Sequence, residues 1–166
     1  MNGLRVAALM AATITTGLMA GVYAIYSNAF MPGLATTDDK TFVGAFQAVD
    51  RAILNPVFLL LGFVGSAVFT LLAGLLNLKE PALPWLAVAF ALNLITIIVT
   101  IAVNVPLNDA LKAAGDPATI DVAAARAAFD EARWRAFNLL RTVLMLVSFG
   151  LLGWALYLTG KSAAQP

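Results

Sequence analysis

The chain has 166 residues, of which 61% are hydrophobic and 11% charged, and its mean hydropathy is +0.90. About a quarter of the residues in a soluble domain are charged, so this composition predicts an integral membrane protein. A net charge of +1 argues against nucleic acid as a partner. Histidine and cysteine are absent, which excludes disulfides and disfavours haem, zinc, copper and iron–sulfur sites. We therefore expect no metal and no cofactor, other than a metal brought by a substrate or a partner.

Four apolar stretches predict an all-α, four-transmembrane-helix bundle that forms one domain over residues 1–166. At 1.5 Å per residue, each is long enough to cross about 30 Å of hydrocarbon. They cover about residues 4–26, 56–78, 84–105 and 136–158. The first is too long for a secretory signal, so we expect a retained helix. Its Gly17 and Gly21 allow close helix contact, which favours packing within the bundle, with homo-oligomerisation as the alternative.

The two longer connections between spans are predicted to carry amphipathic interfacial helices. Met31-Pro32-Gly33 is expected to end the first helix, because proline removes a backbone donor. Residues 41–52 then place apolar side chains at helical spacing, which is typical of a helix lying at the interface. Pro106 is expected to close the third helix, followed by a loop over residues 107–120. A second amphipathic helix begins with Asp121 as its N-cap and is expected to continue without a break into the fourth span.

The third span carries a polar stripe along one face, since four side chains recur every three or four residues. These are Asn93, Thr96, Thr100 and Asn104. An asparagine amide turned towards lipid would leave its donors and acceptors unsatisfied, so this face must contact protein.

The two ends of the bundle differ in charge and in aromatic content. Trp85, Trp154 and Tyr157 fall at the end with the short turn and the two tails, as expected of an aromatic belt. Basic residues are more frequent at the end with the long connections, and plain counting places that end in the cytoplasm. We expect a multi-pass protein of a bacterial-type plasma membrane, with membrane lipid around it.

Three residues at the start of the fourth span suggest a site. Trp134, Asn138 and Arg141 stand at i, i+4 and i+7 and share one helix face. Arg141 lies about five residues, or roughly 7 to 8 Å, inside the span. It is either an interfacial anchor or part of an inward pocket, and its two neighbours favour the pocket.

The other spans bring further polar side chains to the same level. These are Asn104 and Asn108 from span three, Asn55 from span two, Tyr23 and Tyr26 from span one, and Gln47 from the first connection. A helix cap or an interhelical bond is the ordinary role of any one asparagine, but their convergence indicates a site. No thiol, metal triad or intramembrane acid is available, which disfavours hydrolysis and metal-dependent oxidation. Hydrogen-bond donors, one cation and an apolar enclosure suit an aromatic or quinone-like ligand and an oxyanion on it.

Four short motifs, spread over nearly the whole chain, are similar to those of one family of four-helix membrane proteins. They are Phe30-Met31-Pro32-Gly33-Leu34, Phe46-Gln47 with Asn55-Pro56, Asn104-Val105-Pro106-Leu107-Asn108, and Trp134 with Asn138 and Arg141. The chain resembles the DUF1772, or anthrone oxygenase-like, family. The last two motifs together are fairly specific, whereas either alone would be weak.

The resemblance implies an oxidoreductase that converts an anthrone or a similar aromatic polyketide with dioxygen as cosubstrate and no cofactor. Family membership does not by itself establish oxygenation. On this hypothesis Arg141 and Asn138 stabilise the enolate oxygen, and Asn104 and Asn108 orient the substrate. Trp134 and Tyr26 stack on the substrate rings, Tyr23 and Asn55 lie at the site, and Gln47 covers its mouth. Asp109 is the nearest acid in the sequence and a candidate base.

Two other classes of function stay open on the sequence. One is a non-enzymatic protein that binds a quinone or lipid, or that supports assembly of a membrane complex. The other is transport, which is disfavoured because no intramembrane carboxylate is available for proton coupling.

Overall fold

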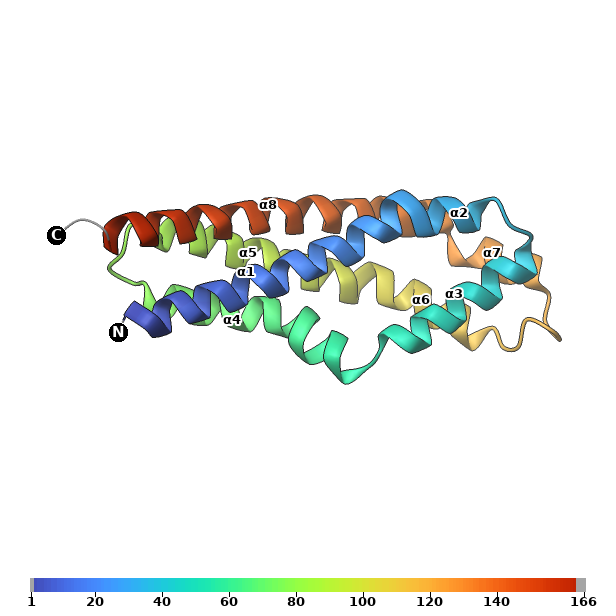
Figure 1. Ribbon diagram of the computed structural model, residues 1–166. Coiled ribbons are helices and arrows are strands. Elements are labelled where there is room, and N and C mark those ends of the chain that lie inside the picture. Colours follow the sequence, from blue (N-terminus) through green and yellow to red (C-terminus); the bar gives the residue numbers. More distant parts are fainter. Residues whose placement is uncertain (1, 164–166) are drawn as a thin grey trace.

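The computed structural model describes residues 2–163, and all regular secondary structure in this part of the chain is helical. Four segments are long and apolar enough to cross a membrane, which confirms the predicted bundle and is consistent with a multi-pass integral membrane protein. They are Gly3–Ala35, Val57–Leu76, Leu83–Ala113 and Glu131–Ser162. The two chain ends lie at one end of the elongated bundle, together with the turn between α4 (Gly65–Leu76) and α5 (Leu83–Val99) (Figure 1).

The helical elements follow one another with short connections. The first segment comprises α1 (Asn2–Ile25), η1 (Tyr26–Phe30) and α2 (Met31–Ala35), and α3 (Asp39–Ile53) leads to η2 (Val57–Val64) and α4 (Gly65–Leu76). The third segment comprises α5 (Leu83–Val99), η3 (Thr100–Asn104) and α6 (Val105–Ala113), followed by α7 (Val122–Phe129) and α8 (Glu131–Ala163). The three η elements are π-helical. The short helices α3 and α7 are the two predicted amphipathic helices.

Both the first and the third segment continue through a proline, so the prediction that Pro32 and Pro106 end their helices is wrong. A π-helical turn precedes each proline: the N–H of Met31 donates to the carbonyl of Tyr26, and the N–H of Val105 donates to that of Thr100. In a regular α-helix a proline ring collides with the carbonyl four residues earlier. A local π turn rearranges the backbone bonds, which lets a membrane helix continue past a proline.

The prediction of one continuous helix from Asp121 into the fourth span is also wrong, because the helix is interrupted at Asp130. Asp121 is the N-cap of α7, as predicted, and accepts a hydrogen bond from the N–H of Ala124 at 3.0 Å. Asp130 has φ of +51°, in the left-handed region that aspartate tolerates better than most residues. Its carboxylate accepts a hydrogen bond from the N–H of Arg133 at 3.2 Å and so caps the start of α8.

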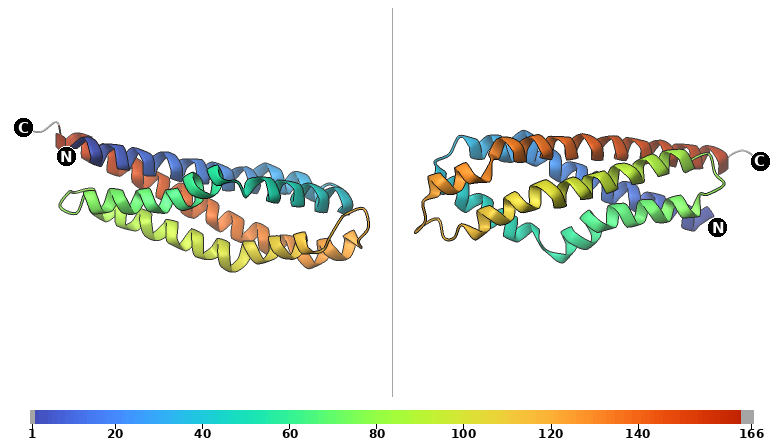
Figure 2. Two further views of the ribbon diagram at one scale, coloured as in Figure 1. Left: turned by 90° about the horizontal axis from the view of Figure 1, so that it is seen from below. Right: turned by 180° about the vertical axis from the view of Figure 1, so that it is seen from behind.

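The long helices pack through small and polar side chains. Helix α1 contacts α4 and α8, and α5 contacts the same two helices (Figure 2). The buried Asn93 donates to the Oγ of Ser148 at 2.9 Å, so the polar stripe of α5 faces protein as predicted. Gly17 lies against Phe149 of α8 within the same chain, whereas Gly21 has open space at its Cβ position. At the far end the ring of Trp154 packs against those of Trp85 and Tyr157, as expected of an aromatic belt.

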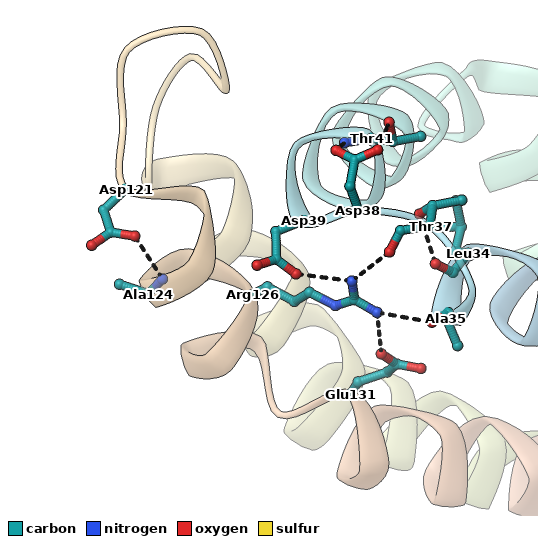
Figure 3. Close-up of polar contacts among 10 residues, drawn as sticks. All are labelled: Leu34, Ala35, Thr37, Asp38, Asp39, Thr41, Asp121, Ala124, Arg126 and Glu131. Atoms are coloured by element: carbon teal, nitrogen blue, oxygen red, sulfur yellow. Dashed lines mark hydrogen bonds and ion pairs between the residues drawn. The ribbon is translucent and has the colours of Figure 1, made fainter.

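Helices α2, α3, α6 and α7 gather at the other end of the bundle, where Arg126 connects several of them (Figure 3). Its guanidinium donates to the carbonyl of Thr37 and to the carboxylate of Asp39, both at 3.0 Å, and to Glu131 at 3.4 Å. Its Cζ also lies 4.2 Å from the ring centroid of Phe42. One side chain thus joins the α2–α3 connection, α7 and the start of α8.

Asp38 begins α3 as its N-cap. Its carboxylate accepts hydrogen bonds from the hydroxyl of Thr41 at 2.6 Å and from the N–H of Thr41 at 3.0 Å. These bonds hold the pKa of this exposed carboxyl below its ordinary value.

Candidate functional site

A cavity lies near the end where α3, α6 and α7 gather, between α1, η1, α3, η2, η3, α6 and α8. Its empty space, including the part that opens to the surroundings, is about 650 Å³. Its aromatic lining is Tyr23, Tyr26, Phe46, Phe58, Phe63 and Trp134, and its polar lining is Asp50, Thr100, Asn108, Asn138 and Arg141. The chain between α3 and α4 bows away from the other helices beside this cavity (Figure 1).

Arg141 is a buried cation in the wall of the cavity, with 5% of its surface exposed. Its Nη1 donates to the Oγ1 of Thr100 at 3.1 Å, and its Nη2 donates to the Oδ1 of Asn138 at 2.8 Å. Its Cζ lies 4.5 Å from the ring centroid of Tyr23 and 5.6 Å from that of Trp134. Within residues 2–163 no carboxylate lies at ion-pair distance from it. The guanidinium therefore faces inward, without a charged partner.

Asn138 holds Arg141 in this orientation. The Nδ2 of Asn138 donates to the carbonyl of Tyr23 at 3.0 Å and to the Oγ of Ser27 at 2.7 Å, while its Oδ1 accepts from Arg141. Both ends of this amide are thus occupied by protein. Asn138 positions the cation and joins α8 to α1 and η1.

A second polar network contains Asp50, a buried acid on α3 that lines the same cavity. The Nε1 of Trp134 donates to the Oδ1 of Asn108 at 2.7 Å, and the Nδ2 of Asn108 donates to the Oδ1 of Asp50 at 2.7 Å. The Nζ of Lys112 lies 2.8 Å from the Oδ2 of Asp50 and 3.0 Å from the Oδ1 of Asp109. The indole of Trp134, the amide of Asn108 and the carboxylate of Asp50 are therefore fixed relative to one another.

Asp50 was not among the site residues expected from the sequence, because it lies outside the predicted spans. The signal that could have found it is its spacing: Phe42, Phe46 and Asp50 stand at i, i+4 and i+8, on the buried face of α3. The acid that the sequence suggested as a base, Asp109, does not line the cavity, and 61% of its side chain is exposed.

The structure brings most of the expected site residues into the cavity wall. Those that line it are Tyr23, Tyr26, Asn108, Trp134, Asn138 and Arg141. Three others lie outside the lining and bond to backbone groups. Asn104 donates to the carbonyl of Trp134 at 3.2 Å; Asn55 accepts from the N–H of Phe58 at 3.0 Å, at the start of η2; and Gln47 donates to the carbonyls of Leu111 at 2.8 Å and Gly115 at 3.0 Å. Gln47 therefore holds the end of α6 and does not cover the mouth of the cavity.

The arrangement combines a cation that has no ion-pair partner among residues 2–163, a carboxylate on another helix and several aromatic rings in one largely apolar cavity. Such a site can bind a planar aromatic molecule and stabilise negative charge on one of its oxygens.

Comparison with known proteins identifies a family for this chain. The anthrone oxygenase family profile matches residues 42–151, about two thirds of the 166 residues. No curated protein and no solved structure matches the chain. The matched region runs from α3 to the middle of α8, so it contains both Asp50 and Arg141. The chain therefore belongs to the anthrone oxygenase family.

Proposed function

We propose that this protein is a cofactor-independent oxygenase that oxidises an anthrone or a similar aromatic polyketide within the membrane. The observation that carries the proposal is Arg141, a buried guanidinium without a carboxylate partner among the described residues, in an aromatic cavity. Burying an unpaired charge is costly. The cost is offset if a substrate oxygen becomes negative beside it during the reaction.

The proposed reaction begins with loss of a proton from the acidic CH₂ group of the substrate. The electron pair moves to the carbonyl oxygen, and the resulting oxyanion lies beside Arg141. This electron-rich anion passes one electron to dioxygen; the substrate radical and superoxide combine into a peroxide anion, which takes up a proton. Loss of the second proton from the same carbon breaks the O–O bond and leaves a new carbonyl. Overall CH₂ and O₂ become C=O and H₂O, and the protein binds, deprotonates and shields the substrate.

The contacts around the cavity give four polar residues a part in this proposal. Arg141 stabilises the oxyanion and Asn138 positions Arg141, because both ends of the Asn138 amide are already bonded. Asn108 fixes the indole of Trp134, and Asn104 holds the backbone at the same residue. The rings of Trp134 and Tyr26 lie 5.7 Å apart at 43° and offer apolar faces to a planar substrate.

The proposed setting is a bacterial-type plasma membrane, with the cavity end on the cytoplasmic side. Supporting this orientation, Lys40, Arg51, Lys112, Arg126, Arg133 and Arg135 belong to elements at that end. A hydrophobic substrate can then partition into lipid before it enters the cavity.

The test is oxygen uptake by the purified protein in nanodiscs with anthrone as the probe. We expect one O₂ consumed and one anthraquinone formed per anthrone, with one atom of ¹⁸O₂ in the product and the other in water. Dialysis against a chelator should leave the rate unchanged. A rate no higher than that of empty nanodiscs would refute the oxygenase. If mass spectrometry then finds a copurified, unaltered quinone, the second candidate, a quinone-binding protein suited to this apolar cavity, replaces it.

A further inference from the structure

Asp50 is the carboxylate that faces the cavity, and its surroundings suggest a part in the chemistry. We propose that Asp50 is the general base that removes the proton from the substrate carbon, an inference that rests on the oxygenase function proposed above. Its carboxylate takes the proton from the CH₂ group, the C–H electron pair moves to the substrate oxygen beside Arg141, and the protonated Asp50 then returns this proton to the peroxide anion. When the second C–H bond breaks, Asp50 takes that proton and passes it to the departing hydroxide, forming water. No proton is gained or lost over one cycle.

The choice of Asp50 follows from what else lines the cavity. Four described lining residues have titratable side chains: Tyr23, Tyr26, Asp50 and Arg141. Of these, a carboxylate is the group that ordinarily carries the negative charge a base needs near neutral pH. Asp50 and Arg141 lie on different helices, α3 and α8, and do not pair with each other. The acid and the cation can therefore act on two different atoms of one substrate.

Two neighbours hold the carboxylate without using all of its acceptor sites. Asn108 donates to Oδ1 at 2.7 Å and Lys112 lies 2.8 Å from Oδ2. A carboxylate offers about four lone-pair sites, so room remains for the substrate proton. Lys112 is partly exposed, with 23% of its side chain accessible, whereas 8% of the Asp50 side chain is accessible. Asn108 and Lys112 are therefore positioning residues for the base.

Two other acids near this end are not placed to act on a molecule in the cavity. Asp109 shares Lys112 with Asp50 but is 61% exposed and lies outside the lining. Glu131 is occupied by Arg126 and Arg135. Asp109 therefore offers a matched control, because it is an acid on the same lysine that does not reach the cavity.

The experiment separates deprotonation from oxidation. Anthrone is incubated anaerobically with the protein in D₂O, and exchange of its methylene hydrogens is followed by mass spectrometry. Oxygen uptake is measured in parallel, and intrinsic tryptophan fluorescence reports binding of anthrone. We expect wild type to accelerate exchange and Asp50→Asn to lose about 100-fold or more of this acceleration, the usual contribution of a general base, while anthrone still binds. Asp109→Asn should stay within about threefold of wild type.

Two further variants guard against loss of structure. Asp50→Asn/Lys112→Met removes both charges, so no unpaired ion remains buried at this position; Asp109, the other partner of Lys112, is 61% exposed and stays solvated. The double variant should therefore fold and show the same loss of exchange. In Asp50→Ala, added formate or acetate should restore exchange, with the stronger base restoring more, a response that a purely structural role would not produce.

The outcomes are distinguishable. If wild type consumes oxygen and Asp50→Asn or the double variant exchanges at the wild-type rate, Asp50 is not the base and the oxygenase stands. If wild type binds anthrone but neither exchanges its protons nor consumes oxygen, the oxygenase is refuted, and the role of Asp50 with it.

Discussion

Replacing Arg141 by methionine keeps a long side chain in the cavity wall and removes its charge. Arg141 lies ten residues after Glu131, the first residue of α8, or about 15 Å along the helix. At an effective dielectric constant of 20, a charge about 4 Å from an oxyanion stabilises it by about 4 kcal/mol. Loss of one oxyanion-hole donor typically costs about 2.7 to 4 kcal/mol. We therefore expect kcat/KM for anthrone oxidation to fall about 10²- to 10³-fold in Arg141→Met.

The same change should alter stability little, because two terms oppose each other. Removing a buried charge saves up to about 2.5 to 3.5 kcal/mol on membrane insertion scales. Against this, the Oδ1 of Asn138 loses its donor, and an unsatisfied buried acceptor costs about 1 to 3 kcal/mol. The midpoint of thermal unfolding in detergent should stay within a few degrees of wild type. Arg141→Met should therefore lower the rate of oxidation without a large change in the stability of the fold.

The assay is the initial rate of oxygen uptake in nanodiscs, together with circular dichroism on heating. Arg141→Lys is the control, because it keeps the charge but loses the planar guanidinium that bonds both Thr100 and Asn138. Its rate should lie between those of wild type and Arg141→Met. A fully folded Arg141→Met protein with a rate within threefold of wild type would refute the role of the cation in turnover.

Three further predictions concern the fold. Arg126→Met should speed amide hydrogen exchange in α3 and α7 and leave α4 and α5 unchanged, because this side chain joins only elements at the cavity end. Gly21→Ala should raise the free energy of unfolding by about 0.5 to 1 kcal/mol, because the added Cβ has open space. Gly17→Ala should raise it less, since its Cβ would lie 2.8 Å from the ring of Phe149. Chemical denaturation compares the two variants, and an equal gain in stability would contradict this packing. The pKa of Asp38 is lowered in the folded state, so its contribution to α3 is present at neutral pH and is lost as pH falls through the acid range; hydrogen exchange of the first turn of α3 should show this loss in wild type and not in Asp38→Ala.

Much of the fold follows from local patterns in the sequence. The four segments are predicted by hydropathy, because every span must satisfy its backbone within itself. Helical periodicity alone places Trp134, Asn138 and Arg141 on one face, and the structure turns that face into the cavity. The N-cap at Asp121 could also be predicted, since a cap depends only on residues close by in the sequence.

Other features depended on contacts between segments, which a linear pattern does not contain. Whether Pro32 and Pro106 end a helix depends on how the backbone groups freed by each proline are hydrogen-bonded. Here a π-helical turn precedes each proline, and the helix continues past it. Asn55 and Gln47 have the side chains expected of a binding site, yet their bonds go to backbone groups at helix ends. Asp50 lies outside the predicted spans, and only the packing of α3 at the bundle end buries it beside the cavity. The membrane class, the spans and the face that carries the cation can be predicted from hydropathy and helical period alone. Which carboxylate shares the cavity with Arg141 depends on how helices distant in the sequence pack against one another, so it is seen only in the folded bundle.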